Sequence, residues 1–493
     1  MNIFSSQDAQ RFFFDISALQ DYIRHYSRYS GIQRVVVSVL VELSKTLPAD
    51  RIYLSWLDAR TGQYWCTKFS EVGAEPFSSP SEMRKAFHPK LFRNPALRPL
   101  QKYSGKRGKY LFHRTRYDAL SLLGQDQKFR RFNMTAEQWR LARKQKPTPV
   151  VTKALPRTAF AEVARPGDRL VIMDSSWTAE HSRAFSSVSS TGVRTYTMVH
   201  DLIPLKATST CDSGSVGAFF EWIYAAKDYS DEFLTVSYST KRDLAEFLRA
   251  HSVERPIKVV QLAQSPLAST PAEDQEICDL SPISSILPED TYPDCMTLLS
   301  VSDSVRQIMM SPYVLCVGTL EGRKNIWRVA MTWKYLLDQG HVDLPKLVFA
   351  GRMGWAISDV VDFLKGTNYL NGAIRFAEAP SDKELDFLYR NCEFTIMASL
   401  YEGWGLPVGE ALAYGKTAVV ADNSALPEVG GDLVEYCDAT QIKSIAKAVV
   451  TLLDPEHRKT LENRIAAADL RSWKDVANDL SNAISAPVQE ALV

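Results

Sequence analysis

The sequence lacks the features that mark a disulfide scaffold, a zinc module or a membrane span. Its seven cysteines are an odd number and form no C-x-x-C pair, which fits neither a disulfide framework nor a zinc site. Its apolar runs are about four to eight residues long, whereas a membrane-crossing helix needs about 20. The stretch MNIFSSQDAQRFFFDIS has no basic segment followed by an apolar one, so we expect no export signal. A reducing cytoplasm is the expected setting.

Several catalytic motifs are also absent. The sequence contains no Walker A loop, no G-x-S-x-G elbow and no H-E-x-x-H helix, which argues against a P-loop nucleotidase, a serine hydrolase of that type and a zinc hydrolase. No D-x-D pair is present to hold a catalytic divalent cation. We therefore expect no metal and no cofactor.

The net charge is only +1, but the charge is unevenly distributed. Residues 81–150 hold 18 Lys and Arg against four acidic residues, an excess of +14, so the rest of the chain carries −13. Aromatic side chains such as Phe87, Tyr103, Phe112 and Trp139 lie among these cations. The mixture favours contact with an anionic membrane surface. An ordinary solvated basic surface is the alternative, and no nucleic-acid-binding motif accompanies the segment.

The length predicts two domains, because a single hydrophobic core stops growing well below 493 residues. Short apolar runs alternate with amphipathic segments in both halves, which is typical of β-α units around parallel sheets. Strands are expected at 11–17, 51–57, 169–175, 195–201, 232–238 and 257–263, and again at 313–319, 346–351, 373–378, 392–399 and 416–422. The expected domains are 1–264 with a basic insertion at about 81–150, a linker or insertion at 265–311, a second domain at 312–471 and a terminal helical segment at 472–493.

The strongest indication of a binding site lies in the segment SLYEGWGLPVGEALAYG, residues 399–415. A strand, a glycine-rich turn and a helix start follow one another, so backbone N–H groups near Gly405 and Leu406 point at one place and favour a phosphate. Glu410, about one turn into the helix, can accept hydrogen bonds from both hydroxyls of a ribose. Glu402, at the strand end, would face the sugar instead. The alternative is a βα turn with two solvated glutamates.

A second strand, turn and helix start lies at VGTLEGRKN, residues 317–325. Arg323 and Lys324 would add charge-assisted hydrogen bonds to a diphosphate there, each of about 1.5–3 kcal/mol. An exposed basic pair before a helix is the alternative. Because this loop and the 402–410 loop both follow strands of one predicted parallel sheet, we expect them to converge at its carboxyl edge.

Residues 313–440 resemble the C-terminal half of glycosyltransferase family 4, the retaining GT-B enzymes. The E-x7-E motif of that family is here Glu402-GWGLPVG-Glu410, with Arg323-Lys324-Asn325 before it. More loosely, SGIQRVV (30–36) resembles the glycine loop after the first strand, and VHDLIPL (199–205) resembles the H-D-x-x-P segment. Many relatives have an arginine directly after the strand-end glycine, where this chain has Thr319 after Gly318, and Arg323 is the candidate to supply that charge.

The resemblance implies a GT-B fold, in which two Rossmann-like parallel-sheet domains face a cleft and a C-terminal helix crosses back to the first domain. It also implies the site. Lys324 and Arg323 bind the donor diphosphate with Gly318, Gly405 and Leu406 around it, Glu402 contacts the donor sugar, Glu410 the ribose, Gly31 lies by the phosphates and His200 by the sugar. By this carry-over the catalytic residues are Glu402, His200 and Lys324. No nucleophile is expected.

The implied activity is retaining transfer of a hexose from a nucleoside diphosphate sugar to a glycan or lipid-linked acceptor, in cell-surface polysaccharide or lipopolysaccharide assembly. Mannose from GDP-mannose, or a related deoxyhexose, is the favoured donor, and the expected place is the cytoplasm or the inner face of the membrane. A catalytically silent nucleotide-sugar-binding subunit and a nucleotide-sugar epimerase are the alternatives. A phosphorylase would need a lysine-bound pyridoxal cofactor, for which the sequence offers no convincing site.

Overall fold

The computed structural model describes residues 10–26, 28–29, 31–59, 61–88, 97–103, 107–130, 132, 134–144, 155–265, 301–308 and 310–486. Contacts divide the chain into two compact units. The first comprises Met1–Met198, Glu221–Leu234 and Ala477–Val493, and the second Val199–Phe220 and Thr235–Val476. Most of the predicted linker, 266–300, lies outside the described residues.

The first sheet has eight strands in the order β4-β3-β2-β1-β5-β6-β7-β8. Its strands are β1 Phe12–Asp15, β2 Ile52–Asp58, β3 Gln63–Lys68, β4 Thr158–Ala159, β5 Arg169–Ile172, β6 Arg194–Val199, β7 Glu232–Thr235 and β8 Ile257–Val259. β1 pairs in parallel with β2 and β5, whereas β3 runs antiparallel to β2 and β4. Strands β3 and β4 were not among the predicted strands, and they give this edge an antiparallel hairpin whose turn is closed by the hydrogen bond from the N–H of Gly62 to the carbonyl oxygen of Asp58.

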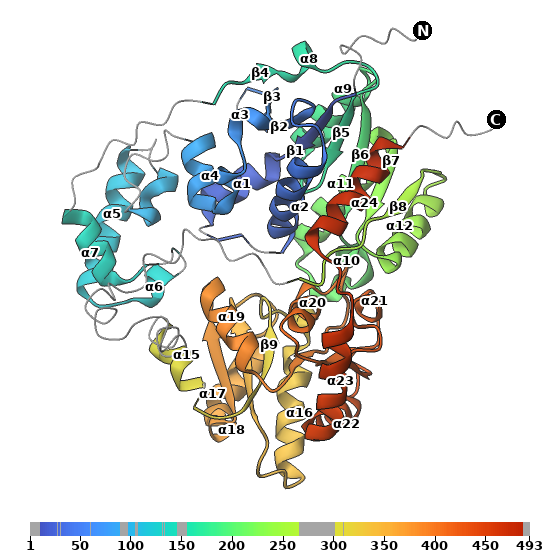
Figure 1. The fold of residues 1–493 in the computed structure, drawn as a ribbon. Coiled ribbons are helices and arrows are strands. Elements are labelled where there is room, and N and C mark those ends of the chain that lie inside the picture. Colours follow the sequence, from blue (N-terminus) through green and yellow to red (C-terminus); the bar gives the residue numbers. More distant parts are fainter. Residues whose placement is uncertain are drawn as a thin grey trace, which may run out of the picture. The chain divides into compact units, whose positions relative to one another are not determined.

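The helices that accompany this sheet are visible in Figure 1. They are α1 Ser17–His25, α2 Ile32–Thr46, α3 Phe69–Val72, α4 Pro80–Phe87, α8 Phe160–Val163, α9 Ala179–Ser189, α10 Ile203–Lys206, α11 Ser213–Tyr229 and α12 Tyr238–Ala250, with short 3-10 turns η1 Glu75–Ser78 and η4 Thr208–Thr210. Gly31 immediately precedes α2, and the side chain of Ser237 caps α12.

The basic insertion forms a small helical group with its own core. It contains the 3-10 turn η3 Arg98–Tyr103 and the helices α5 Arg107–Leu122, α6 Gln127–Arg130 and α7 Ala136–Lys144. Tyr117, Phe129 and Trp139 are buried together at its centre. The Trp139 indole and Arg143 both donate hydrogen bonds to Asp118, at 2.9 and 3.0 Å, so α5 and α7 are joined by a polar contact as well as by apolar packing.

The second sheet has six parallel strands in the order β11-β10-β9-β12-β13-β14. They are β9 Tyr313–Val317, β10 Lys346–Gly351, β11 Ile374–Glu378, β12 Thr395–Met397, β13 Ala418–Ala421 and β14 Glu435–Cys437. Leu347 and Phe349 pack into one core, while the alternate residues Val348 and Ala350 pack into another. Both faces of the sheet are therefore buried, which explains why the strands read as continuous apolar runs.

The helices around the second sheet are α15 Asp303–Ile308, α16 Ile326–Asp338, α17 Ser358–Gly366, α18 Asn368–Gly372, α19 Asp382–Asn391, α20 Leu406–Ala413, α21 Leu426–Gly430, α22 Ile442–Leu453 and α23 Pro455–Ala467, with the 3-10 turn η6 Gly322–Lys324. Ser381 and Glu384 form a capping box at the start of α19. The predicted terminal helix is α24, Trp473–Ser485, and its residues from Ala477 onward group with the first unit. There the guanidinium of Arg169 donates a hydrogen bond to the carbonyl oxygen of Ile484 at 3.2 Å.

A close approach of two backbones fixes the carboxyl edge of this sheet, and it generates a prediction. A Cβ atom on Gly351, at the end of β10, would lie 1.8 Å from the carbonyl oxygen of Gly318, whereas one on Gly366 would meet nothing within 4 Å. Gly351→Ala should therefore lower the free energy of unfolding by about 3 kcal/mol, as overpacking does. Gly366→Ala is the matched control, and equal urea midpoints for the two variants would contradict this view of the edge.

Candidate nucleotide-sugar site

The loop after β9 is tied to the neighbouring strand ends by Asn325. This residue begins α16 with a left-handed backbone, φ 59°. Its side-chain amide donates to the carbonyl oxygens of Ala398, at 2.9 Å, and Ala439, at 2.7 Å. The N–H of Leu400 donates to the carbonyl oxygen of Arg323 at 2.9 Å. The two predicted site loops, at 318–325 and 399–410, are thus joined directly, as expected for neighbouring parallel strands.

Arg323, Lys324 and Glu402 meet at one point. Arg323 and Lys324 each place a nitrogen 2.7 Å from the same carboxylate oxygen of Glu402. The Arg323 guanidinium also donates to the carbonyl oxygen of Tyr401, at 2.7 Å, and pairs with Glu321 at 2.6 Å. Arg323 therefore braces both loops, whereas Lys324 makes its ion pair with Glu402 alone among the described residues.

Burial and charge oppose one another at Glu402. Its side chain is buried, and burial by itself raises the pKa of a carboxyl group. The nearby charges of Arg323 and Lys324 outweigh that effect and lower the pKa of Glu402 to about 2. Burial lowers the pKa of Arg323, but Glu402 and Glu321 reverse the effect and raise it. The Glu402 carboxylate and the Arg323 guanidinium are therefore charged at neutral pH.

Two glycines make room for this arrangement. A Cβ on Gly318, whose φ is +142°, would lie 3.3 Å from Cε of Lys324, so the lysine stem crosses directly over this glycine. Gly405, with φ +110°, precedes α20, and a Cβ there would lie 2.6 Å from Leu426. The helix then begins at Leu406 with Pro407 in its first turn, a position that suits proline. Glycine is required at both turns.

Glu410 is buried on α20 rather than solvated. The hydroxyl of Tyr389, on α19, donates a hydrogen bond to one of its carboxylate oxygens at 2.6 Å. Burial, and then the neighbouring Glu410, raise the pKa of Tyr389 well above its ordinary value, so this tyrosine remains a donor. Tyr389 therefore holds Glu410 near the start of the helix. The ribose role of Glu410 stays a prediction.

The segment after β6 also reaches the site loop. His200 and Asp201 group with the second unit, and a Cβ on Gly403 would lie 2.1 Å from the carbonyl oxygen of His200. The hydroxyl of Thr240 lies 3.3 Å from that same oxygen. Asp201 is partly buried, and desolvation raises the pKa of its carboxyl group against the lowering effect of Arg323. The backbone of His200 thus lies against the turn between Glu402 and Gly405.

Gly31 belongs to the first unit. It precedes α2 with φ 48° and ψ −120°, a conformation that favours glycine. The side-chain amide of Gln33 in the same helix donates to Asp174 at 3.3 Å. The expected place of Gly31 beside the donor phosphates therefore stays a prediction.

Four further residues shape the site without having been singled out from the sequence, namely Glu321, Asn325, Asp201 and Tyr389. Glu321, Asn325 and Asp201 lie within the quoted motif segments, so the motifs could have suggested them. Tyr389 lies 21 positions before Glu410, and only the packing of α19 beside α20 reveals that pair.

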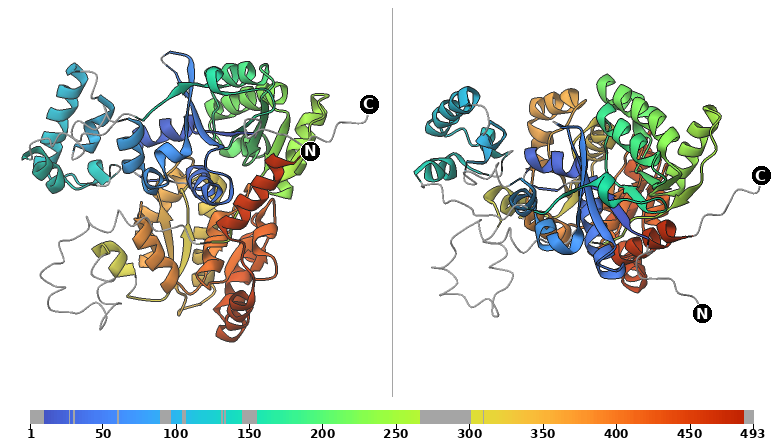
Figure 2. Two further views of the ribbon diagram at one scale, coloured as in Figure 1. Left: turned by 45° about the horizontal axis from the view of Figure 1, so that its top comes forward. Right: turned by 90° about the horizontal axis from the view of Figure 1, so that it is seen from above.

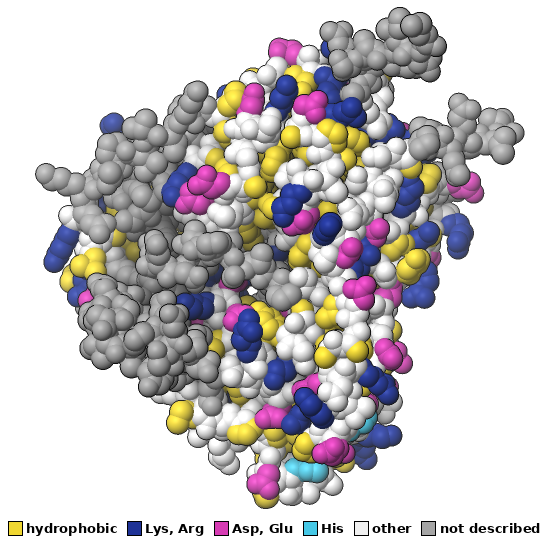
Figure 3. All heavy atoms as spheres, in the orientation of Figure 1, with side chains coloured by type: hydrophobic (Ala, Val, Ile, Leu, Met, Phe, Trp, Pro, Cys, Tyr) yellow, Lys and Arg dark blue, Asp and Glu magenta, His cyan; other side chains and the backbone are white. Residues whose placement is uncertain are grey.

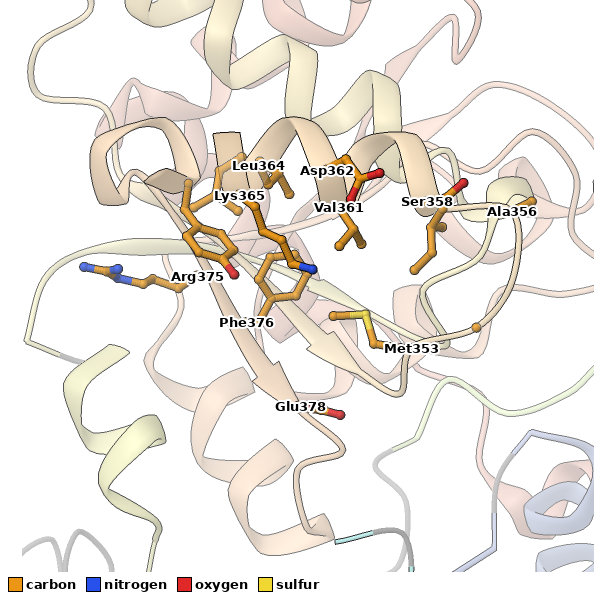
Figure 4. Close-up of a pocket in the computed structure, with 14 residues that line it drawn as sticks. Met353, Ala356, Ser358, Val361, Asp362, Leu364, Lys365, Arg375, Phe376 and Glu378 are labelled. Carbon is orange, nitrogen blue, oxygen red and sulfur yellow. The ribbon is translucent and has the colours of Figure 1, made fainter. Parts of the chain in front are cut away.

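A separate pocket of about 870 Å³ opens between α17 and β11 (Figure 4). Its walls include Met353, Tyr369 and Phe376, with Lys365 extending from α17 across the apolar floor, whereas Arg375 points away. None of the predicted site residues lines it. The pocket adjoins the site loop through two backbone hydrogen bonds. The N–H of Gly354 donates to the carbonyl oxygen of Leu320, and the N–H of Leu320 donates to the carbonyl oxygen of Arg352, each at 2.8 Å.

Comparison with known families gives a match within the second unit. Residues 302–470 match the family described as "Glycosyl transferases group 1". The matched segment contains both site loops and every residue of the Arg323, Lys324 and Glu402 cluster. It does not contain His200 or Gly31.

Sequence relatives are mannosyltransferases. The chain is 31% identical over 179 residues to O-antigen chain mannosyltransferase B of Escherichia coli, a match covering 36% of this chain and 46% of that protein. It is 24% identical over 253 residues to serotype-specific mannosyltransferase WbdA of Escherichia coli, covering 51% of this chain and 29% of the relative. The matched parts thus span less than half the length of these relatives.

Solved structures with low sequence identity share the fold over the whole chain. An α,α-trehalose-phosphate synthase from Burkholderia xenovorans, 11% identical, aligns with 97% of this chain and 100% of its own at a TM-score of 0.52. The OtsA apo structure, 10% identical, also aligns with 97% of this chain and 100% of its own, at a TM-score of 0.53. The chain has the GT-B fold. The predicted α/β architecture, with its returning C-terminal helix, is confirmed for this GT-B protein.

The charge cluster generates a pH prediction. Because the pKa of Glu402 falls from 4.5 to about 2 on folding, its stabilising effect is complete above pH 4.5 and is lost as the pH falls toward 2. Glu402→Gln should therefore lower the free energy of unfolding by roughly 3 kcal/mol at neutral pH. Denaturant titrations of both proteins at pH 7 and pH 3 should show the difference shrinking in acid. Glu254→Gln, at an exposed position, is the control. If the difference in free energy of unfolding between the unchanged protein and Glu402→Gln did not change with pH, this would argue against the ion pairs.

Proposed function

We propose that this GT-B protein is a retaining glycosyltransferase that moves a hexosyl group from a nucleoside diphosphate sugar to an acceptor hydroxyl. The observation that carries the proposal is the meeting of Arg323, Lys324 and Glu402 between two helix starts at the carboxyl edge of a parallel sheet. That edge is where open α/β sheets bind their ligands. The match of the same segment to glycosyl transferases supports the choice of reaction.

The donor diphosphate is held by Lys324 and by the N-terminus of α20. Backbone N–H groups and the helix dipole at such a terminus favour an anion. Lys324 turns toward the diphosphate, because a single carboxylate holds it in the ligand-free protein. Arg323 has three partners, in Glu321, Tyr401 and Glu402, so it acts mainly by positioning Glu402 and fixing the loop.

Charge separates as the nucleotide leaves. Negative charge grows on the diphosphate, where Lys324 and the helix N-terminus stabilise it, and positive charge grows on the sugar ring. The carboxylate of Glu402, kept ionised by its low pKa, faces that ring together with the His200 and Asp201 segment. The new bond forms on the face that the nucleotide leaves, so the anomeric configuration is retained. We assign no covalent nucleophile.

Mannose is the proposed sugar, with GDP-mannose as its donor and a cell-surface polysaccharide as the product. The names of the relatives, an O-antigen chain mannosyltransferase and a serotype-specific mannosyltransferase, support this choice. The acceptor is a glycan or lipid-linked glycan.

Among the described residues, no group of three or more His, Cys, Asp or Glu side chains is arranged to hold a metal ion. We propose that the reaction uses Lys324 and backbone dipoles, with no cofactor.

The cytoplasm is the proposed site of action. The five cysteines of the described ranges, Cys66, Cys211, Cys316, Cys392 and Cys437, are free thiols. Burial raises the pKa of four of these thiols, those of Cys66, Cys316, Cys392 and Cys437, to about 12. Such thiols stay protonated and unreactive, which suits a reducing compartment.

The first test measures turnover of the donor by the unchanged protein and GDP binding by a variant that lacks the Lys324 side chain. The protein should release GDP from GDP-mannose when an acceptor glycan is present, with the product retaining its anomeric configuration by NMR. Lys324→Ala should weaken GDP binding about 10- to 100-fold, because one charge-assisted contact is lost. Lys447→Ala, on the exposed side of α22, is the matched control. Tight GDP binding without turnover would indicate a silent binding subunit, and sugar interconversion without acceptor an epimerase.

A second test separates the two glutamates. Glu410→Gln should weaken binding of bare GDP, because a charged acceptor for the ribose hydroxyls is lost, and Tyr389→Phe should do so to a smaller extent. Glu402→Gln should leave GDP binding equal or tighter, because it frees Lys324, while lowering transfer. Calorimetry with GDP and steady-state kinetics with GDP-mannose distinguish the two effects. Equal loss of GDP affinity in the Glu402 and Glu410 variants would refute this division.

A further inference from the structure

Helix α5 of the basic insertion is apolar on two opposite sides. One side contributes Tyr117 to the core of the insertion, and Asp118 beside it bonds to Trp139 and Arg143 of α7. The other side carries exposed apolar residues at helical spacing. Leu111, Phe112 and Leu122 are 51%, 67% and 79% exposed, and Leu123, directly after the helix, is 71% exposed. These four residues define the outer apolar face of α5.

The residues between them on the same side are uncharged. Gly108, Thr115 and Ala119 stand three or four positions from the members of the apolar face, so they share its side of the helix. All three are exposed. The outer side of α5 thus presents an uninterrupted strip of uncharged residues to its surroundings.

Cations flank this strip. On the helical projection, Lys109 and Arg116 border it on one side. On the other side Asp118, which is paired with Arg143 of α7, stands between the strip and Arg107. Arg107, Lys109 and Arg116 are exposed, and no ion pair joins these three cations to an acidic side chain in the described part of the chain. Exposed hydrophobic patches rimmed by charge mark interaction sites rather than ordinary surface. In both views of Figure 2, α5, α6 and α7 form a group of helices at one end of the first unit.

We propose that the outer face of α5 lies in the interface of an anionic lipid bilayer, parallel to its plane. The apolar strip enters the boundary between headgroups and acyl chains, and the flanking cations contact lipid phosphates, which is the arrangement of interfacial amphipathic helices. Lys and Arg suit this edge because their apolar stems remain beside the strip while their charges reach the headgroups. No helix in the described ranges is long and apolar enough to cross a bilayer. The proposal does not depend on the donor or on the reaction.

An uncharged protein partner would explain the leucines and Phe112 but not the exposed cations Lys109, Arg116 and Arg107 near the strip. Nucleic acid would explain the cations but not the uncharged strip between them, since phosphate backbones are met by positive charge. Only an anionic interface accounts for both features at once. On the face drawn in Figure 3, the second unit instead mixes basic and acidic side chains.

The test uses the full chain and vesicles of phosphatidylcholine, with or without phosphatidylglycerol. The protein should co-sediment with the anionic vesicles at low salt, bind them less at high salt and bind neutral vesicles weakly. Phe112→Ser with Leu123→Ser should reduce binding about tenfold or more, because two large apolar side chains no longer enter the interface. Lys109→Glu with Arg116→Glu should reduce it at least tenfold, since each basic residue near an anionic surface contributes about fivefold.

Matched controls carry the same changes elsewhere. Val342→Ser with Val450→Ser removes two exposed apolar side chains, and Lys443→Glu with Lys447→Glu reverses two exposed charges on α22. Both should bind vesicles as the unchanged protein does, and all four variants should keep their circular dichroism and GDP affinity. Negligible binding to anionic vesicles, or equal losses in the α5 variants and their controls, would overturn the proposal. So would normal binding by the Phe112 and Leu123 variant.

Discussion

The site depends on one buried carboxylate that neutralises two cations. Glu402 brings the ends of β9 and β12 together through Arg323 and Lys324, and neither loop would hold those cations out of water alone. Removing charges from water is costly, and only close pairing offsets the cost. The rest of the local structure serves this contact. Gly318 allows the lysine stem to pass, Asn325 joins the strand ends, and Gly403 admits the His200 backbone.

The second half of the fold could be predicted because its local signals agree with one another. The apolar runs at 346–351 and 416–422 are buried on both faces, so their continuous pattern marks the parallel strands β10 and β13. Likewise, Ser381 and Glu384 form the capping box that their spacing indicates. The antiparallel strand β3 was missed because its sequence, QYWCTK, alternates only partly and its turn lacks an Asn-Gly or Asp-Gly pair.

The site could be predicted as a set of residues but not as a set of contacts. Sequence spacing placed Lys324 and Glu402 at one sheet edge, because parallel strands end there together. It could not show that the two cations share one oxygen of Glu402, since this depends on the length and path of each loop. It also could not show Tyr389 beside Glu410, which follows from the packing of two helices. Nor could it show that α5 is apolar on its outer side as well as its inner side, because periodicity alone does not reveal which side faces a core.

The balance of charge explains why Arg323 and Lys324 have different tasks. In the ligand-free protein, Arg323 and Lys324 are matched by Glu321 and Glu402, so the four charges sum to zero. A diphosphate adds negative charge, and a site of zero charge attracts it only if a cation can change partners. To bind the diphosphate, Arg323 would have to break its contacts with two carboxylates and a carbonyl oxygen. Lys324 would break only its ion pair with Glu402 among the described side chains. Desolvation raises the pKa of the nearby Asp201, and the charge of Arg323 lowers it in part. With the helix dipole of α20 beside it, Lys324 is therefore the cation whose transfer from carboxylate to phosphate costs least.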